Sequence, residues 1–223
     1  MVWRVLCAAM EAVMLLSAQS GKPADDLIVP GVRVGPVTAT STEASLIKQL
    51  GRDTVKQQVD LGEGDFEPGL VIYKDDPTRR LEIVWNADVP AHPEYVFICR
   101  DANYPLPHCR WRTAGGVTLG TTLKELARAN GKPFKMVVWG SDVGGHVLFD
   151  GGTLDHGTTL FNRLNLTLEP RRENGHYVPK LTKDEEDQVY DGEKVISSTN
   201  PVLQKINPLV VVLTMEFPRR SGK

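Results

Sequence analysis

The sequence predicts an α+β protein with mostly antiparallel strands and a few short helices. Short runs rich in Val, Ile, Leu and aromatic residues recur along the chain, separated by Gly, Pro, Asn and Asp. The helix-like segments are short and begin near Ser or Thr. The 223 residues are 41% hydrophobic and 24% charged, which is typical of a folded protein with enough chain to bury a core.

The charge balance and the hydropathy pattern argue against two classes of protein. The formal net charge is −2, which is not the basic footprint of a nucleic-acid binder. After the first 20 residues, no apolar run approaches the roughly 18–20 residues needed to span a bilayer. We therefore expect no nucleic-acid partner and no membrane span, while the oligomeric state stays open.

Residues 1–20 have the pattern of a secretory signal peptide. Arg4 precedes an apolar stretch, which ends in small residues at Ser17, Ala18 and Ser20. Glu11 lies inside the apolar stretch, and this leaves open a second interpretation, an N-terminal helix of the mature protein. We expect export to the periplasm or out of the cell.

Two cysteines support this expectation. Cys7 lies in the signal segment, so Cys99 and Cys109 remain as an even pair around a turn-rich loop. A disulfide between them is expected in an oxidising compartment. Two unrelated reduced thiols are the alternative.

Residues 35–51 and 115–131 align with each other without a gap. Each segment starts with Gly and a Val-Thr pair and ends at Gly51 or Gly131. The hydroxyl of Ser41 or Thr121 is predicted to cap a short helix with one apolar face, which the final glycine ends. Chance similarity of two short helices is the alternative to a common architecture.

Strands bounded by turn residues are predicted after each helix. They are expected at 55–61, 69–73, 81–85, 95–100, 111–113, 134–139, 146–149, 163–168 and 209–217. A turn at 140–145 joins two of them as a hairpin. The strand at 209–217 is almost wholly apolar, which indicates a central position. Thr182 and Glu185 form a capping box that predicts a third helix, and residues 197–201 are interpreted as a loop.

The chain is accordingly divided into three parts. Residues 1–20 form the signal peptide, and residues 31–155 form a tandem helix-plus-sheet region with units at about 33–113 and 114–160. Residues 160–218 form a C-terminal strand and helix extension that is expected to pack on the same sheet.

The repeated unit also carries a resemblance. A Gly-Thr start, a short helix that ends in Gly and a following hairpin resemble the unit of β-lactamase-inhibitor-protein-like exported bacterial proteins. Segments 62–64, 76–85 and 120–134 are similar to segments of an uncharacterised family of exported bacterial proteins. The resemblance covers about residues 33–155. It implies two related helix-plus-antiparallel-sheet units and supplies no catalytic residues.

Several common catalytic motifs are absent or misplaced. Both Gly-Lys pairs are followed by Pro, which does not fit a phosphate-binding loop. Ser141 stands one place too early for a nucleophile elbow and lies in the predicted hairpin turn. A glycosidase needs two carboxyl groups at a defined distance from each other, and the sequence does not give the distances among its candidate carboxylates. These carboxylates are Glu63, Asp65, Glu67 and Glu82.

The strongest metal candidate is a His and Asp group at 146–156. On one strand, His146 and Asp150 would share a face because their separation is even, and the following loop could return Asp155 or His156 to them. Such ligands suit a hard or borderline divalent cation. No recognised zinc spacing is present, and these residues are also common in turns. We expect no organic cofactor, and a divalent metal is the alternative.

A second candidate is a binding patch at Trp139, Ser141 and Asp142. Core packing is the simpler interpretation of the strand aromatics. An exposed ring beside the 140–145 hairpin would instead serve a partner. We therefore expect a non-enzymatic binding or structural role in the cell envelope, with an envelope protein as partner. The alternative is a metal- or carboxylate-assisted hydrolase of an envelope substrate.

Overall fold

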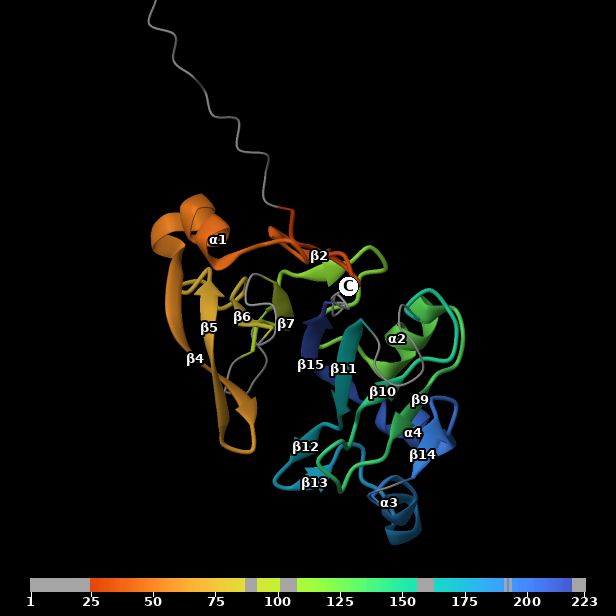
Figure 1. Ribbon diagram of the computed structural model, residues 1–223. Coiled ribbons are helices and arrows are strands. Elements are labelled where there is room, and N and C mark those ends of the chain that lie inside the picture. Colours follow the sequence, from red (N-terminus) through yellow and green to blue (C-terminus); the bar gives the residue numbers. More distant parts are fainter. Residues whose placement is uncertain are drawn as a thin grey trace, which may run out of the picture.

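The computed structural model describes residues 25–86, 92–100, 108–155, 163–190, 192 and 194–217, so the predicted signal peptide lies outside the described residues. Figure 1 shows the α+β arrangement that the sequence predicts, with short helices around mostly antiparallel sheets. The parallel pairing of β1 (Leu27–Val29) with β8 (Arg112–Thr113) is an exception.

A six-stranded antiparallel sheet is the centre of the structure. Its order is β11 (Leu164–Glu169), β15 (Leu209–Glu216), β7 (Pro93–Ile98), β6 (Leu81–Trp85), β5 (Asp65–Ile72) and β4 (Thr54–Gly62). The apolar strand predicted at the C-terminal side, β15, lies between β11 and β7. This confirms its central position.

Smaller sheets extend the central one. The second sheet has the order β10 (Val147–Leu148), β9 (Lys135–Val137) and β14 (Val195–Ser197). An antiparallel bridge joins His146 to Thr167 of β11, and the Leu168 amide donates to the Gly145 carbonyl at 2.9 Å. The antiparallel pairing therefore continues from one sheet to the next. β2 (Arg33–Val34) and β3 (Val37–Thr38) pair beside β1, and β12 (Arg172–Glu173) pairs with β13 (His176–Tyr177).

Four short helices lie around these sheets in the described part of the chain: α1 (Glu43–Leu50), α2 (Leu123–Asn130), α3 (Lys183–Val189) and α4 (Pro201–Ile206). The capping box of α3 is as predicted, because Thr182 accepts from the Glu185 amide. The interpretation of residues 197–201 as a loop was confirmed for residues 198–200 and wrong at its two ends. β14 ends at Ser197, and Asn200 caps α4, which has Pro201 in its first turn.

The predicted caps of α1 and α2 were wrong by one residue. Thr42 and Thr122 are the N-caps, each within a capping box. Ser41 and Thr121 serve the preceding turn instead, because their hydroxyls accept the backbone amides of Thr38 and Thr118, each at 2.9 Å. These two buried hydroxyls hold the chain at the angle from which each helix starts.

The two helix-start segments, residues 35–51 and 115–131, share more than their caps. The Ser41 amide donates a hydrogen bond to the Thr38 carbonyl at 3.0 Å, and the Thr121 amide donates to the Thr118 carbonyl at 3.2 Å. Both helices are followed by a glycine with positive φ, Gly51 or Gly131. The following strands differ, because β4 to β7 belong to the central sheet whereas β9 and β10 belong to the second sheet.

The C-terminal part contributes strands to both sheets. β11 and β15 complete the central sheet, and β14 pairs with β9. The main hydrophobic core lies against one face of the central sheet and includes Leu70, Ile83, Val96 and Met215. The helices α1, α2 and α4 contribute Leu46, Leu126 and Leu203 to the same core.

Candidate functional site

The face of the central sheet opposite the main core contains a cavity of about 560 Å³. Residues of β4, β6, β7 and β15 line it, together with Arg100, which follows β7. The lining residues are Gln57, Gln58, Asp60, Leu61, Gly62, Glu82, Phe97, Arg100 and Val212. β5, β6 and β7 separate β4 from β15 in the sheet, yet both outer strands line one cavity. The sheet is therefore curved, and we call this cavity the concave groove.

Gly69 of β5 lies where the sheet needs close packing on this face. A Cβ atom there would lie 2.5 Å from the Val59 side chain of β4 and 2.5 Å from the Ile83 carbonyl oxygen. Because glycine has no side chain, Val59 packs across β5 and is buried. Val71 and Val84 are buried with it on the same face. This small apolar layer supports the floor of the groove.

A buried carboxylate lies in the floor. Glu82 of β6 accepts from Arg80 Nε on Oε1 at 2.9 Å, and from Arg100 Nε and Nη2 on Oε2 at 3.1 and 2.6 Å. Charge-assisted bonds of this kind are the strong ones in proteins. Both carboxylate oxygens are thus occupied by guanidinium groups. The geometry makes Glu82 an anchor for two arginines rather than a carboxylate presented to a substrate.

Arg100 also packs on an aromatic ring. Its guanidinium carbon lies 4.0 Å from the centroid of Phe97, the residue opposite Glu82 in the β6–β7 register. A cation held over a ring face is attracted by the ring quadrupole. Glu82 and Phe97 therefore fix Arg100 from two sides, and its half-buried side chain forms part of the groove surface.

Apolar side chains complete the groove and remain accessible. Leu61 and Val212 are each 39% exposed, on the strands at opposite sides of the groove. The charges largely cancel, because Glu82 faces two arginines and Asp60 adds one further negative charge. A concave surface with accessible apolar groups and a few placed polar groups is typical of a binding site.

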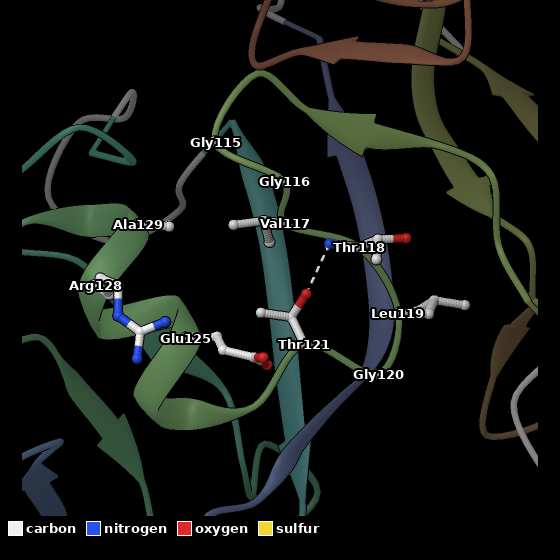
Figure 2. A pocket seen from close by; sticks show the side chains of 10 residues that line it. All are labelled: Gly115, Gly116, Val117, Thr118, Leu119, Gly120, Thr121, Glu125, Arg128 and Ala129. Carbon is white, nitrogen blue, oxygen red and sulfur yellow. Dashed lines mark hydrogen bonds between the residues drawn. The ribbon is translucent and has the colours of Figure 1, made fainter.

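A second cavity, of about 620 Å³, lies between the loop at 115–121 and α2. Figure 2 shows Glu125 and Arg128 projecting from α2 toward this loop, while the side chains of Thr118 and Leu119 point away from the helix. The Glu125 carboxylate is hydrogen-bonded to the N-cap residue of α2, Thr122. The Thr122 amide donates to it at 2.9 Å and the Thr122 hydroxyl donates at 2.8 Å. These hydrogen bonds lower the pKa of Glu125. This cavity is built mainly from glycine, hydroxyl and cap groups, so the concave groove is the better candidate.

The structure corrects the predicted binding patch at Trp139. The indole ring is only 4% exposed, and its N–H donates to the Leu168 carbonyl at 2.7 Å. The ring therefore packs in the core, because it is buried and its N–H has a hydrogen-bond acceptor. Ser141 and Asp142 are exposed, as a partner surface requires. The exposed apolar side chains near them are Val143 and Tyr190, and the Tyr190 ring lies against Gly140.

The predicted metal residues are distributed differently from the expectation. β10 covers only Val147–Leu148, so His146 and Asp150 do not share one face of a continuous strand. Asp150 is exposed, and Asp155 accepts from the Gly151 amide at 2.7 Å. His156 lies outside the described residues. Within the described ranges, no group of three His, Cys, Asp or Glu residues could hold a metal ion.

His146 has a separate feature. Its Nε2 atom is buried and has no hydrogen-bond partner among the described residues. Burial lowers the pKa of the imidazole, because the charged form would lose its hydration. The side chain therefore favours the neutral form in the folded protein.

The predicted disulfide is present. Cys99 and Cys109 are bonded, with a Cα–Cα distance of 5.8 Å. Cys99 directly precedes Arg100, so this link lies next to a residue that lines the concave groove. Of the predicted turn, residues 101–107 lie outside the described residues.

No family model, no curated protein and no solved structure matches this chain. The resemblance to β-lactamase-inhibitor-protein-like units therefore stays a prediction. The described part of the chain also contains no helix that is long and apolar enough to span a membrane.

Sequence reasoning singled out Glu82 only as one of several carboxylates and did not consider Arg80, Arg100 or Val212. Arg80 directly precedes β6 and lies two residues before Glu82, a spacing that could have indicated a pair on one face of a sheet. The contribution of Arg100 depends on the β6–β7 register, and that of Val212 depends on the strand order. No local motif encodes either of these.

Proposed function

We propose that the protein is an exported binding protein of the bacterial cell envelope, and that its concave groove takes up an apolar side chain from the surface of a partner protein. The observation that carries the proposal is the combination of accessible Leu61 and Val212 with the Glu82–Arg100 anchor in one cavity. Buried apolar contacts in a pre-formed pocket are the usual centre of a protein interface.

The charge distribution supports an apolar occupant. Glu82 is compensated by Arg80 and Arg100, and the lining also includes Asp60, so the formal charges of these four residues sum to zero. The groove therefore has no excess of positive or negative charge that would attract a strongly charged ligand. Polar atoms of Arg100 and Gln57 can instead orient a partner backbone around the inserted side chain.

The disulfide supports export. Such bonds persist in oxidising compartments and are rare in the reducing cytosol. Fractionation of the producing cells should recover the chain outside the cytoplasm, cleaved near residues 18–20. Recovery of the uncleaved chain in the cytoplasm would overturn this part of the proposal.

The groove is tested with a photo-crosslinking amino acid placed at Val212, and in a matched variant at Val143, which is exposed on another surface. We expect an adduct to one protein from position 212 and none to that protein from position 143. Binding of this purified protein should then weaken by about tenfold or more in Leu61→Glu and Val212→Glu, because each places a charge among buried apolar contacts. Val143→Glu should leave the affinity unchanged. If all three variants bind equally, the groove is not the binding site.

We also propose that residues 35–51 and 115–131 are copies of one ancestral unit, as the β-lactamase-inhibitor-protein-like resemblance implies. Supporting this, Ser41 and Thr121 make the same amide contact in the two segments, and Thr42 and Thr122 both cap their helices in capping boxes. If the segments are equivalent, matched substitutions in them should have matched energetic effects.

A further inference from the structure

In the described part of the chain, one edge of the central sheet is a long strand, β4, whose outer side is unpaired. β4 spans nine residues and is the terminal strand in the sheet order. Within the described part of the chain it pairs along its length with β5 alone. Figure 1 shows no other strand on its outer side. Every second backbone amide and carbonyl of an edge strand points outward without a sheet partner.

β4 has little of the protection that isolated edges normally have. It contains no proline, and its one irregularity in pairing lies at the far end, between Asp60 and Gly62. Its single cation, Lys56, contacts the Glu43 carboxylate of α1 and is thereby partly neutralised. Val55 and Leu61 are both accessible on this strand, at 38% and 39% exposure. Long accessible edges of this kind are suited to pairing with another strand.

The sequence of β4 is complementary to itself when it is read in the opposite direction. An antiparallel second copy with Gln58 opposite Gln58 places Lys56 opposite Asp60 of that copy. The same register places Val55 opposite Leu61. Twofold symmetry makes each of these contacts occur twice, and opposite charges and apolar pairs are the favourable cross-strand combinations.

Neighbouring registers lack this complementarity. Centring the pair on Gln57 places Lys56 opposite Gln58, and centring it on Val59 places Lys56 opposite Gly62. Neither register brings opposite charges together.

We propose that β4 pairs antiparallel with β4 of a second copy of this chain, in a twofold dimer centred on Gln58. The pairing joins two central sheets edge to edge and leaves both concave grooves on the same side of the combined sheet. The dimer shares Asp60 and Leu61 with the lining of the concave groove but does not require the partner proposed for it. Val212→Glu lies outside β4 and tests the groove alone.

Charge reversal tests the interface. In Lys56→Glu, two carboxylates face each other at each pair, and in Asp60→Lys two amines do so. Sedimentation analysis should show a dimer for the wild type and an increase of about tenfold or more in the dissociation constant for each variant.

Mixing the two variants is the complementary arm of this experiment. The mixture should dimerise again, because the carboxylate introduced at position 56 of one chain then faces the amine introduced at position 60 of the other. The second pair of the mixed dimer is the unaltered contact between Lys56 and Asp60. As controls, Lys124→Glu and Asp184→Lys make the same charge changes at exposed helix positions and should leave dimerisation unchanged.

A cysteine pair tests the register independently. Gln58→Cys places two thiols at the symmetry axis, with Cα atoms about 4.5–5.5 Å apart, within reach of a disulfide. Thr54→Cys on the same strand places them about 26 Å apart. Oxidation should therefore link the first variant into a covalent dimer and leave the second unlinked. A monomeric wild type at every concentration reached, or equal linking of both variants, would overturn the proposal.

Discussion

The side chain of Glu82 shows how one residue can organise a surface. The carboxylate lies in a sheet floor where an uncompensated charge would be costly, and Arg80 and Arg100 supply the compensation. The bonds to Glu82 also restrict the rotamers of Arg100, whose guanidinium rests on Phe97. A partner that binds in the concave groove therefore meets a guanidinium that is already positioned, which reduces the entropy lost on binding.

At the same scale, His146 is expected to make stability depend on pH. Burial lowers its pKa in the folded state below the ordinary value of about 6.5, so protonation favours the unfolded chain. The stabilising contribution of the neutral ring is complete above that ordinary value and is lost as the pH falls toward the lowered pKa. Urea unfolding at about pH 7.5 and about pH 5.5 should show a smaller loss of stability for His146→Gln than for the wild type. His176→Gln, at an exposed position, is the control, and an equal loss in all three proteins would contradict the assignment.

Some single-residue roles could be predicted and others could not. The Cys99–Cys109 bond could be predicted because the two cysteines outside the predicted signal segment allow one simple pairing. The predicted binding patch needed an exposed Trp139, but the ring is buried, as the simpler interpretation of core packing held. The Leu168 carbonyl that accepts its N–H lies on β11, far along the sequence. A side chain's exposure depends on such distant neighbours, which local sequence does not show.

Among the structural elements, the two helix-start turns allow a matched test. The buried hydroxyls of Ser41 and Thr121 each accept a backbone amide at 2.9 Å. Ser41→Ala and Thr121→Ala should each lower the free energy of unfolding by about 1–3 kcal/mol, because a buried amide loses its acceptor. Chemical denaturation should show the two losses to be similar.

The control for these turns is Thr40→Ala, which removes an exposed hydroxyl from the first turn. Its effect should stay within about 0.5 kcal/mol. A loss at one of the two turns and none at the other would argue against equivalent segments.

Strands were easier to predict than their connections. β6 and most of β4 and β15 follow from apolar or alternating runs between turn residues. α4 was missed because the Asn200-Pro201 pair is common both in turns and at helix starts, and six helical residues give little periodic signal. The paired strands β1 to β3 are only two or three residues long, and their pairing rather than their composition defines them.

For the whole molecule, the disulfide is expected to contribute to stability. It closes a loop with a sequence separation of 10, and the chain-entropy model assigns such a loop about 2–3 kcal/mol. The double variant Cys99→Ser/Cys109→Ser should lower the free energy of unfolding by about that amount in urea denaturation. Reductant should reproduce the loss in the wild type and have no effect on the variant. An unchanged wild type under full reduction would contradict this expectation.

The strand order is the feature of the whole molecule that sequence reasoning did not supply. The concave groove exists because β4 and β15 line one cavity although three strands separate them. On this face, Gly69 leaves room for the Val59 side chain, because a Cβ atom would lie 2.5 Å from it. A glycine inside a predicted strand indicates close packing of some kind, but it does not identify which neighbour fills the space.

The central place of β15 has a consequence for how the chain is made. β7 and β11 pair with β15 on either side, so both lack this neighbour until residues 209–216 have been synthesised. The side of β7 that faces β15 therefore stays open from about residue 98 until β15 is made, and that of β11 stays open from about residue 169. Such open edges are exposed to proteases and to aggregation. Export in an unfolded state would delay this assembly until the last strand has crossed the membrane, so that the central sheet closes in one late step.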